Sequence, residues 1–229
     1  MNNRIELINE IIRIKKFKSY LEIGVFGGEC LFNINVLNKV AVDPLFGFGL
    51  KTRIKYLFKN RNHRIKYFEL PSNMFFEKNR VSFDLIFIDG LHTWQQLCLD
   101  IKNSINFLSP NGLILIHDSL PKSKWEALPA KSYEDFLRLK PQNESTLWCG
   151  DGWKVLFEIK KQIKNLDLKV VNIDHGIGVI LNGFNKGQHF SDLSTEKTDN
   201  YIFENDFQDY LEIIEIINTE TLFDILKKS

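Results

Sequence analysis

Two short stretches of the chain end in residue types that transfer protons or bind metal ions. FDLIFIDG contains Asp89 and is followed by His92, and GLILIHD ends in His117 and Asp118. A histidine, whose pKa lies near neutrality, can take a proton from a hydroxyl group at physiological pH. The same side chains could ligate a divalent cation, and an imidazole favours manganese, iron or zinc, because magnesium prefers oxygen ligands.

Two chemistries therefore stay open for these four residues. In the first, Asp89, His117 and Asp118 bind a metal ion. In the second there is no metal, Asp118 hydrogen-bonds an acceptor molecule, and His92 or His117 is the base. Each residue also has a structural alternative, since Asp89 could satisfy backbone donors at the start of the next helix and His92 could be a partly buried structural histidine.

A glycine-rich stretch, YLEIGVFGGECL, predicts a loop that holds a small ligand. Its spacing is GxxGG, which lacks the second glycine of the dinucleotide fingerprint GxGxxG. Glu22 precedes Gly24 by two residues, where a carboxylate would repel a pyrophosphate but not a ligand that carries an ammonium and a sulfonium group. Asp43, at the end of the next apolar run, is placed to accept both hydroxyls of a ribose. Gly24 and Gly27 could otherwise serve only a tight turn.

Alternating strands and helices would position these groups. Short apolar runs at 19–25, 40–44, 65–70, 83–90 and 112–118 predict strands, and helices are expected at 3–16, 28–37, 48–60, from Ser72 onward, and at 93–107. Strands that are apolar throughout are typical of a parallel sheet covered on both faces. The polar residues stand at the carboxyl ends of these strands, where such folds bind their ligands. The predicted fold is α/β, a Rossmann-like, doubly wound, seven-stranded sheet.

The second half of the chain is expected to complete this domain. Residues 119–147 hold three prolines and show no strand pattern, so they predict a loop insertion over the active edge. A helix should follow at 148–165, and the runs at 168–174 and 177–182 predict an antiparallel hairpin. We expect one domain over 1–229, with an N-terminal helix in 1–18 and a helical C-terminal extension over 190–229.

Composition excludes several classes of function. The 229 residues carry 30 basic and 29 acidic side chains, so no global field favours a nucleic acid or a membrane surface. The three cysteines form no CxxC pair, which indicates reduced thiols of a cytoplasmic protein. No apolar run reaches the roughly 18 residues that a membrane-spanning helix needs. The expected partner is a small molecule, with a homo-oligomer as a further expectation.

The order of the motifs resembles a known family. ExGxxxG, VAVDP, FDLIFIDGLHTW and LSPNGLILIHD follow one another as in class I S-adenosylmethionine-dependent methyltransferases. The stretch from FIDGLHTW to LILIHD is similar to a branch of small-molecule and sugar O-methyltransferases, which includes metal-dependent enzymes that finish macrolide and aminocoumarin sugars. The resemblance covers residues 19–118 and 148–182.

The resemblance implies a role for each motif residue. Those assigned to S-adenosylmethionine are Glu22, Gly24 and Gly27 along its methionine part, Asp43 on its ribose, Ser72 by its adenine, and Asp89 nearby. In the metal-dependent relatives the carboxylate of the DGxH turn binds a divalent cation, here Asp89, together with two acids that end the fifth strand. This chain has His117 and Asp118 there, so an imidazole replaces one acid. The histidine of DGxH, here His92, would be the base on the acceptor hydroxyl.

The acceptor is the least defined part of the sequence interpretation. WCGDGWK places Asp151 and Trp153 close together. They could form a helix cap and a core residue, or Trp153 could stack on a sugar ring while Asp151 binds its hydroxyls. We expect methyl transfer from S-adenosylmethionine to a hydroxyl of a small polyhydroxylated acceptor, a sugar or other sugar-bearing metabolite and thus a carbohydrate. The alternatives are an NAD-type oxidoreductase and a non-catalytic ligand-binding protein of the same fold.

Overall fold

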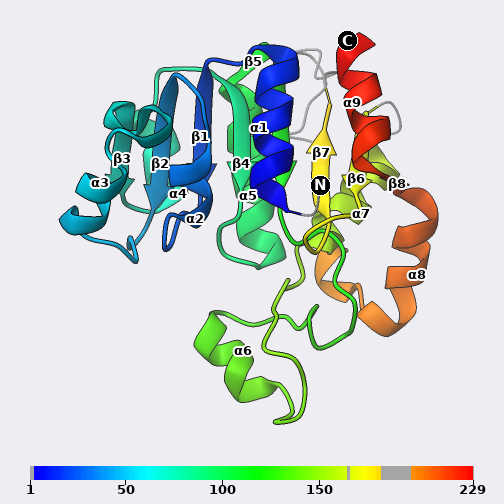
Figure 1. Cartoon of the computed structure of the whole chain (residues 1–229). Coiled ribbons are helices and arrows are strands. Elements are labelled where there is room, and N and C mark those ends of the chain that lie inside the picture. Colours follow the sequence, from blue (N-terminus) through cyan, green and yellow to red (C-terminus); the bar gives the residue numbers. More distant parts are fainter. Residues whose placement is uncertain (1–2, 164–165, 182–196, 229) are drawn as a thin grey trace.

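A computed structural model describes residues 3–163, 166–181 and 197–228, apart from the side chain of Arg61. Strands and helices alternate through most of the chain (Figure 1). The strands are β1 (Ser19–Ile23), β2 (Asn38–Asp43), β3 (Ile65–Glu69), β4 (Phe83–Ile88), β5 (Leu108–Ile116), β6 (Leu168–Val171), β7 (Ile177–Ile180) and β8 (Glu215–Ile217). The helices are α1 (Arg4–Lys15), α2 (Glu29–Asn33), α3 (Leu50–Tyr56), η1 (Lys59–Arg64), α4 (Ser72–Lys78), α5 (Trp94–Asn106), α6 (Tyr133–Leu139), α7 (Trp153–Gln162), η3 (Thr198–Asn200), α8 (Phe203–Ile213) and α9 (Thr219–Lys228).

The strands form one sheet in the order β3-β2-β1-β4-β5-β7-β6-β8. The first five strands of this order are parallel, and β7 runs antiparallel to both β5 and β6. The predicted Rossmann-like α/β fold with an antiparallel hairpin near its C-terminal end is confirmed. An eighth short strand, β8, pairs parallel with β6. It lies where the sequence predicted continuing helix, because the β-branched run from Ile213 to Ile217 suits the free edge of β6.

Two apolar cores lie on opposite faces of the sheet. Helices α4, α5, α7 and α8 pack on one face, and α1, α2 and α9 pack on the other (Figure 1). Both faces are covered because the strand side chains are apolar in both directions, as the continuous runs predicted. The first and last helices lie side by side, and Ile8 and Ile11 of α1 are buried in the same core as Leu222 and Leu226 of α9. The first residues of the predicted extension, 190–196, lie outside the described residues.

The end of β1 is fixed against the end of β4. Gly24 has a φ of 81°, and a Cβ placed there would lie 2.0 Å from the carbonyl oxygen of Asp89. Ile23 accepts a 2.8 Å hydrogen bond from the Asp89 amide, and Gly24 donates a 3.0 Å hydrogen bond to Val42. Only glycine fits this position. The close approach brings the glycine loop next to the DGxH turn.

The 119–147 segment forms a lobe beyond the carboxyl ends of the strands (Figure 1). It contains α6, whose first turn is capped by the Ser132 hydroxyl, which accepts from the Asp135 amide. Phe136 is buried and stacks on Trp148 at 5.6 Å between ring centroids. The predicted loop insertion is therefore an ordered wall with its own small core. No helix in the described parts of the chain is both long and apolar enough to cross a membrane.

Candidate active site

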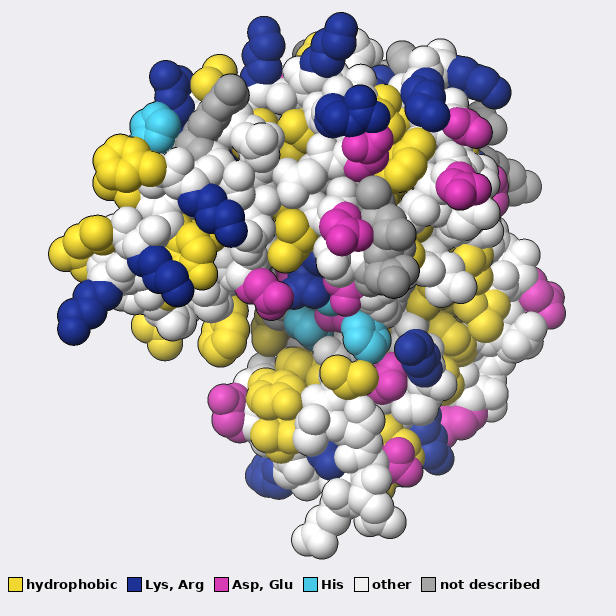
Figure 2. All heavy atoms as spheres, in the orientation of Figure 1, with side chains coloured by type: hydrophobic (Ala, Val, Ile, Leu, Met, Phe, Trp, Pro, Cys, Tyr) yellow, Lys and Arg dark blue, Asp and Glu magenta, His cyan; other side chains and the backbone are white. Residues whose placement is uncertain are grey.

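The crevice lies where β4, β5 and the β6–β7 turn meet the lobe. Figure 2 shows histidine and acidic side chains gathered in the recess between the sheet and the lobe. A pocket of about 20 Å³ opens there, and its lining includes Asp89, His92, His117, Asp118 and Cys149. Such a volume has room for roughly one water molecule. A substrate would therefore need the wall of this pocket to move.

His117 is the centre of the charged groups. Its Nδ1 lies 3.0 Å from Oδ1 of Asp89 and 3.2 Å from Oδ2 of Asp118, and its Nε2 lies 3.7 Å from Oδ1 of Asp174. Burial opposes the charged imidazolium, but the carboxylates of Asp89 and Asp118 outweigh it, so the pKa of His117 is raised well above its usual value. A protonated imidazole cannot accept a proton, which disfavours His117 as the base in this arrangement.

His92 is held differently. Its Nδ1 lies 2.8 Å from the carbonyl oxygen of Trp148 and 3.2 Å from Oδ2 of Asp118, and its ring stacks on the Trp148 indole at 4.9 Å. A carbonyl oxygen only accepts, so Nδ1 must carry the proton and donate it. In the neutral ring the lone pair then belongs to Nε2. The His92 side chain is 24% exposed, so it lies at the surface of the crevice.

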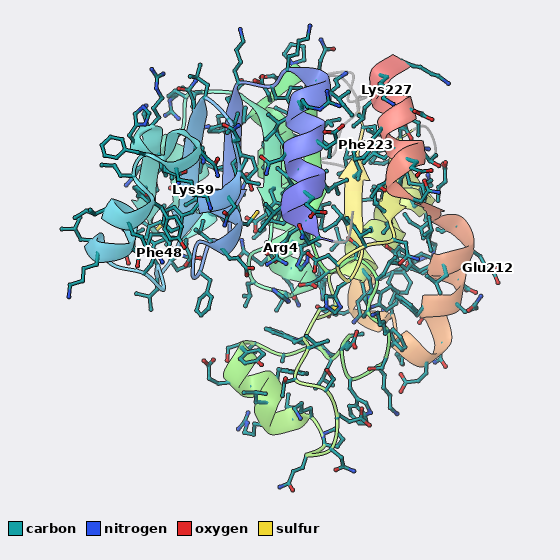
Figure 3. The ribbon with its side chains drawn as sticks, in the orientation of Figure 1. Arg4, Phe48, Lys59, Glu212, Phe223 and Lys227 are labelled. Carbon is teal, nitrogen blue, oxygen red and sulfur yellow. The ribbon has the colours of Figure 1, made fainter. Side chains whose placement is uncertain are left out.

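An arginine from the N-terminal helix helps to balance the carboxylates. Arg4, at the N-terminal end of α1, donates from Nη1 to Oδ2 of Asp174 at 2.9 Å, and its Nε lies 3.8 Å from Oδ2 of Asp89 (Figure 3). Hydrogen bonding to His117 and Arg4 lowers the pKa of Asp174 below its usual range. Burial opposes the ionisation of Asp118, but His117 and His92 outweigh it and lower its pKa. Both acids are therefore ionised.

Three residues around the crevice have a strained backbone conformation, which sets the direction of their side chains. Asp118, Asp174 and His175 have φ values of 55°, 45° and 62°, in the left-handed region that non-glycine residues rarely adopt. Each such residue costs on the order of 1–3 kcal/mol and persists only where the surrounding structure enforces it. The strain is thus concentrated around the crevice.

The carboxylates also form part of a cluster that could hold a cation. Ligand atoms of Asp89, His92 and Asp118 all lie within 4.8 Å of one another. The sequence predicted Asp89, His117 and Asp118 for this role. The structure brings all four residues together, but the His117 imidazole lies between the two carboxylates as their ion-pair partner.

Glu22 does not face the crevice as the sequence argument assumed. It is 1% exposed and accepts a 2.6 Å hydrogen bond from the Tyr20 hydroxyl. Burial raises the pKa of Glu22 to about 8, so the group is largely protonated at neutral pH. The argument that its charge would repel a pyrophosphate therefore does not apply to this structure.

Asp43 organises the glycine loop. Its Oδ2 accepts from the amides of Val25 and Phe26 at 2.7 and 2.8 Å, and its Oδ1 accepts from the Leu45 amide at 2.8 Å. A carboxylate offers about four acceptor positions, so room remains for about one ribose hydroxyl rather than two. Gly27 lies in the open part of this loop, where an added Cβ would meet nothing within 4 Å.

Ser72 belongs to a buried network between α4 and α5. Its hydroxyl donates to Oδ1 of Asp100 at 2.5 Å and accepts from Nε2 of Gln96 at 3.1 Å. Burial raises the pKa of Asp100 to about 6. In this structure the Ser72 hydroxyl is therefore occupied by protein groups.

Asp151 and Trp153 do not line the acceptor side. Trp153 is 1% exposed and packs in the core against Phe207 at 5.1 Å between ring centroids. Oδ1 of Asp151 accepts from the Trp94 amide at 2.8 Å, and its Oδ2 lies 3.2 Å from Nζ of Lys154. Trp153 is thus a core residue and Asp151 is a helix cap, as the structural alternative predicted. The helix that Asp151 caps is α5, however, and not α7, which follows it in the chain. The sugar-stacking assignment is wrong because both side chains are buried.

Four residues that the sequence did not assign also border the crevice. Arg4, Glu126, Cys149 and the carbonyl of Trp148 come from an amphipathic helix and from the lobe, and no local motif marks them. Burial beside Asp118 and Glu126 raises the pKa of the Cys149 thiol, which is therefore protonated. Asp174 and His175 were predicted as turn formers first, and their turn also brings both side chains to the crevice.

Comparison with known proteins decides the family of this region. Residues 21–119 match a family model described as a methyltransferase domain. This segment is a methyltransferase domain. It contains the glycine loop, the DGxH turn and His117–Asp118, so the predicted methyltransferase identity is confirmed over these residues. Among curated proteins, no match to this sequence was found.

Solved methyltransferases share the fold. An O-methyltransferase from Bacillus cereus in complex with S-adenosylhomocysteine is 12% identical, with a TM-score of 0.54 over 78% of this chain and 80% of that one. The O-methyltransferase TomG from Streptomyces achromogenes, in complex with S-adenosylmethionine, is 12% identical, with a TM-score of 0.53 over 79% and 80%. The S-adenosylhomocysteine-bound methyltransferase PaMTH1 from Podospora anserina is 18% identical, with a TM-score of 0.51 over 80% of both chains. At these identities the likeness concerns the fold.

Proposed function

We propose that the protein transfers a methyl group from S-adenosylmethionine to a hydroxyl of a small polyhydroxylated acceptor, a sugar or sugar-bearing metabolite in class. The observation that carries the proposal is the orientation of His92. Its Nδ1–H is committed to the Trp148 carbonyl and Asp118, so Nε2 holds the lone pair that a base needs. The carboxylates and imidazoles around it are groups that hydrogen-bond hydroxyls, which supports an acceptor with several of them.

The cofactor would lie over the glycine loop. Gly24 and Gly27 supply the close approach, and the open space at Gly27 supports a ligand there. Asp43 would bind the ribose with its remaining acceptor position, and Asp89 would lie near the methionine end, as would Glu22 through the loop backbone. A role for Ser72 at the adenine requires its hydroxyl to leave Asp100. The solved relatives that contain S-adenosylmethionine or S-adenosylhomocysteine support this choice of cofactor.

The reaction is an in-line displacement. The acceptor oxygen forms a bond to the methyl carbon, the carbon–sulfur bond breaks, and its electron pair returns to sulfur. The acceptor proton passes to Nε2 of His92. The cofactor carries the activated group, so the protein contributes position, exclusion of water and removal of that proton. Asp118 would orient His92 and stabilise the imidazolium that forms.

A divalent cation fits the same crevice. Two carboxylates and an imidazole nitrogen within 4.8 Å of one another form a suitable donor set. Asp89 and Asp118 would hold the ion together with His92 or His117, and it would polarise the acceptor hydroxyl. If a cation is required, EDTA should abolish methyl transfer and one divalent ion should restore it. Full activity after exhaustive chelation would leave the mechanism based on His92 alone.

The proposal extends to the cellular compartment, the partners and the oligomeric state. All three cysteines are free and buried, which supports a reducing, cytoplasmic setting. A small-molecule acceptor, with no nucleic-acid or membrane partner, agrees with a near-neutral net charge of +1. A homo-oligomer remains part of the proposal.

The test uses the full chain. Calorimetric titration should show binding of S-adenosylhomocysteine and none of NAD at the same concentration. Methyl-labelled S-adenosylmethionine and a panel of small hydroxylated acceptors, including free sugars and glycosides, should then yield a labelled methyl ether. Preference for NAD would overturn the cofactor assignment, and cofactor binding without label in any hydroxylated acceptor would leave the non-catalytic ligand-binding alternative.

A further inference from the structure

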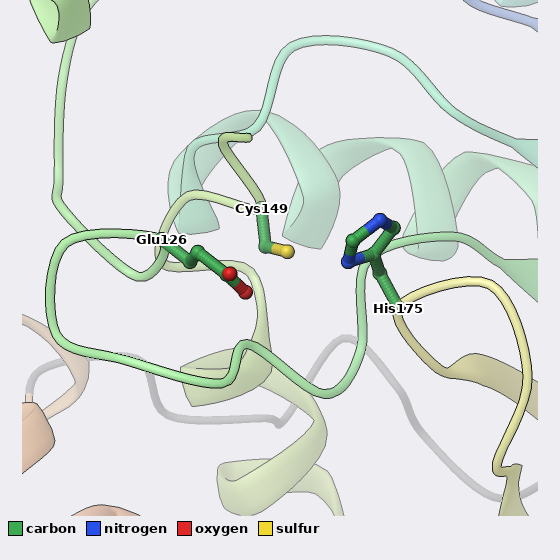
Figure 4. Close-up of side chains that lie close together, drawn as sticks. All are labelled: Glu126, Cys149 and His175. Atoms are coloured by element: carbon green, nitrogen blue, oxygen red, sulfur yellow. The ribbon is translucent and has the colours of Figure 1, made fainter. Parts of the chain in front are cut away.

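A second group of side chains of metal-ligating types lies beside the crevice, between the lobe and the β6–β7 turn. Glu126 comes from the segment after β5, Cys149 precedes α7, and His175 is in the β6–β7 turn. Their ligand atoms all lie within 4.8 Å of one another. Figure 4 shows the Glu126 carboxylate, the Cys149 sulfur and the His175 ring pointing toward one space.

Glu126 and Cys149 are buried, and His175 is partly buried. Cys149 is 3% exposed and Glu126 is 7% exposed. Among the described residues, Nδ1 of His175 is buried and has no hydrogen-bond partner. Such a nitrogen costs free energy, and a missing ion is one physical reason for it. Oε2 of Glu126 accepts from the Lys122 amide at 2.9 Å, which fixes the carboxylate in place.

The backbone holds these ligands in position before any ion arrives. The carbonyl of Glu126 accepts from the amides of Cys149 and Gly150 at 2.8 and 2.9 Å, and the carbonyl of His175 accepts from Leu120 at 2.7 Å. His175 is kept at a φ of 62°, which directs its ring away from the outer face of the turn and toward the sulfur. These bonds join all three ligand segments.

We propose that Glu126, Cys149 and His175 form a binding site for a borderline divalent cation of the zinc type. A thiolate, an imidazole and a carboxylate are the ligands that zinc takes in proteins, and three of them leave a fourth position open. Bond lengths of about 2.0–2.3 Å would draw the ligand atoms to roughly 3.5 Å from one another, which small side-chain rotations can supply. Cys149 releases its thiol proton to solvent when the ion binds.

The site differs in chemistry from the Asp89–Asp118 crevice. Cys149 also borders that crevice, but the cation cluster there consists of Asp89, His92 and Asp118 and has no sulfur, whereas this one contains Cys149. The ion would tie the lobe to the β6–β7 turn and to the residue next to Trp148, whose carbonyl holds His92. Binding should therefore stiffen the acceptor wall.

Cobalt titration of the purified full chain tests the site, because Co²⁺ bound to a thiolate gives a charge-transfer band in the near ultraviolet. The wild type should develop this band, and Zn²⁺ should remove it. Cys149→Ser should not develop it, while Cys98→Ser, which alters another buried thiol on α5, should behave as the wild type. Asp89→Asn should keep the band, which separates the two clusters.

A second variant guards against misfolding of the cysteine mutant. His175→Asn keeps a residue that tolerates the left-handed conformation while it removes the imidazole. Zinc affinity should fall more than roughly tenfold, since even the loss of an outer-shell partner costs 10–100-fold. No thiolate band in the wild type, the same band in Cys149→Ser, or unchanged zinc affinity in a folded His175→Asn would each overturn the proposal.

Discussion

The two halves of the strand edge handle their acids in different ways. On the glycine-loop side, Glu22 is buried as an acid against Tyr20, and Asp43 accepts three backbone amides from its own neighbourhood. On the crevice side, Asp89, Asp118 and Asp174 are ion-paired with side chains from other segments of the chain, Asp118 with His92 and the other two with Arg4.

The acids on the loop side therefore have partners that are near in the sequence, whereas most partners on the crevice side come from remote parts of the chain. The loop side is specified within residues 20–45, where Glu22 and Asp43 find their partners, and by one close backbone approach of Gly24 to Asp89. The crevice depends on the whole fold, because its arginine and its imidazoles come from α1, from the β4–α5 turn and from the end of β5. Substitutions on the loop side should therefore alter folding or cofactor affinity, and those in the crevice should alter turnover.

The largest effect is expected at Gly24. In Gly24→Ala the new Cβ would lie 2.0 Å from the Asp89 carbonyl at a φ of 81°, so the chain should lose more than about 4 kcal/mol of stability or fail to fold. Gly27→Ala is the matched control, since nothing lies within 4 Å of its Cβ. It should keep its denaturant midpoint and bind S-adenosylhomocysteine more weakly. Equal stability of the two variants would contradict the close-approach argument.

The next effect concerns His92. His92→Ala should cut turnover about 10²–10⁴-fold, the typical worth of general base catalysis, and leave binding of S-adenosylhomocysteine nearly intact. His63→Ala, at an exposed position on η1, is the control and should keep wild-type turnover. Turnover and melting temperature measured on the same preparation separate catalysis from packing. A stable His92→Ala with wild-type turnover would rule out the base assignment.

Glu22 should make stability depend on pH. Its pKa is about 8 in the folded chain and near its ordinary 4.5 when unfolded, so between these values only the folded state keeps the proton. The stability contribution is fully present below about pH 4.5 and is lost as the pH rises toward 8. Between about pH 4.5 and 8, the free energy of unfolding of the wild type, measured in urea, should fall by several kcal/mol relative to that of Glu22→Gln. Glu77→Gln, at an exposed position on α4, is the control and should show the same pH dependence as wild type. The same pH dependence in Glu22→Gln would refute the burial argument.

Asp43 gives the smallest expected change. Asp43→Ala should weaken binding of S-adenosylhomocysteine by about 1–3 kcal/mol through the lost charge-assisted acceptor. Asp84→Ala is matched, because Asp84 accepts the amides of Lys18 and Ser19 at the opposite end of the strands. Both variants should lose stability, but only Asp43→Ala should lose affinity in calorimetry. An equal loss of affinity in both would assign the effect to folding.

The sequence predicted what depends on local pattern. Apolar runs located the strands of the parallel sheet, and Gly24 and the DGxH turn lie together at the carboxyl ends of its strands, as expected. The β8 strand was missed because Ile213–Ile217 has both helical periodicity and strand propensity, and the free edge of β6 decided between them.

The sequence could not predict how the charges pair. Whether His117 is a base or an imidazolium depends on Asp89 and Asp174, which the fold places beside it. Trp153 was assigned two alternatives because its neighbour in the core, Phe207, lies more than fifty positions along the chain. The same distance in sequence hid the cluster of Glu126, Cys149 and His175.

The pairing of Arg4 with Asp174 has a consequence for the order in which the protein is made. The two residues are separated by 170 positions, so Arg4 leaves the ribosome long before its partner exists. The glycine loop and the first five strands can form while synthesis continues, since domains generally begin to fold from their N-terminal side. Throughout that period the Asp89 and Asp118 carboxylates lack the hairpin that completes their charge balance. The nascent chain therefore completes its glycine-loop half first, and its crevice only when the β6–β7 turn has emerged.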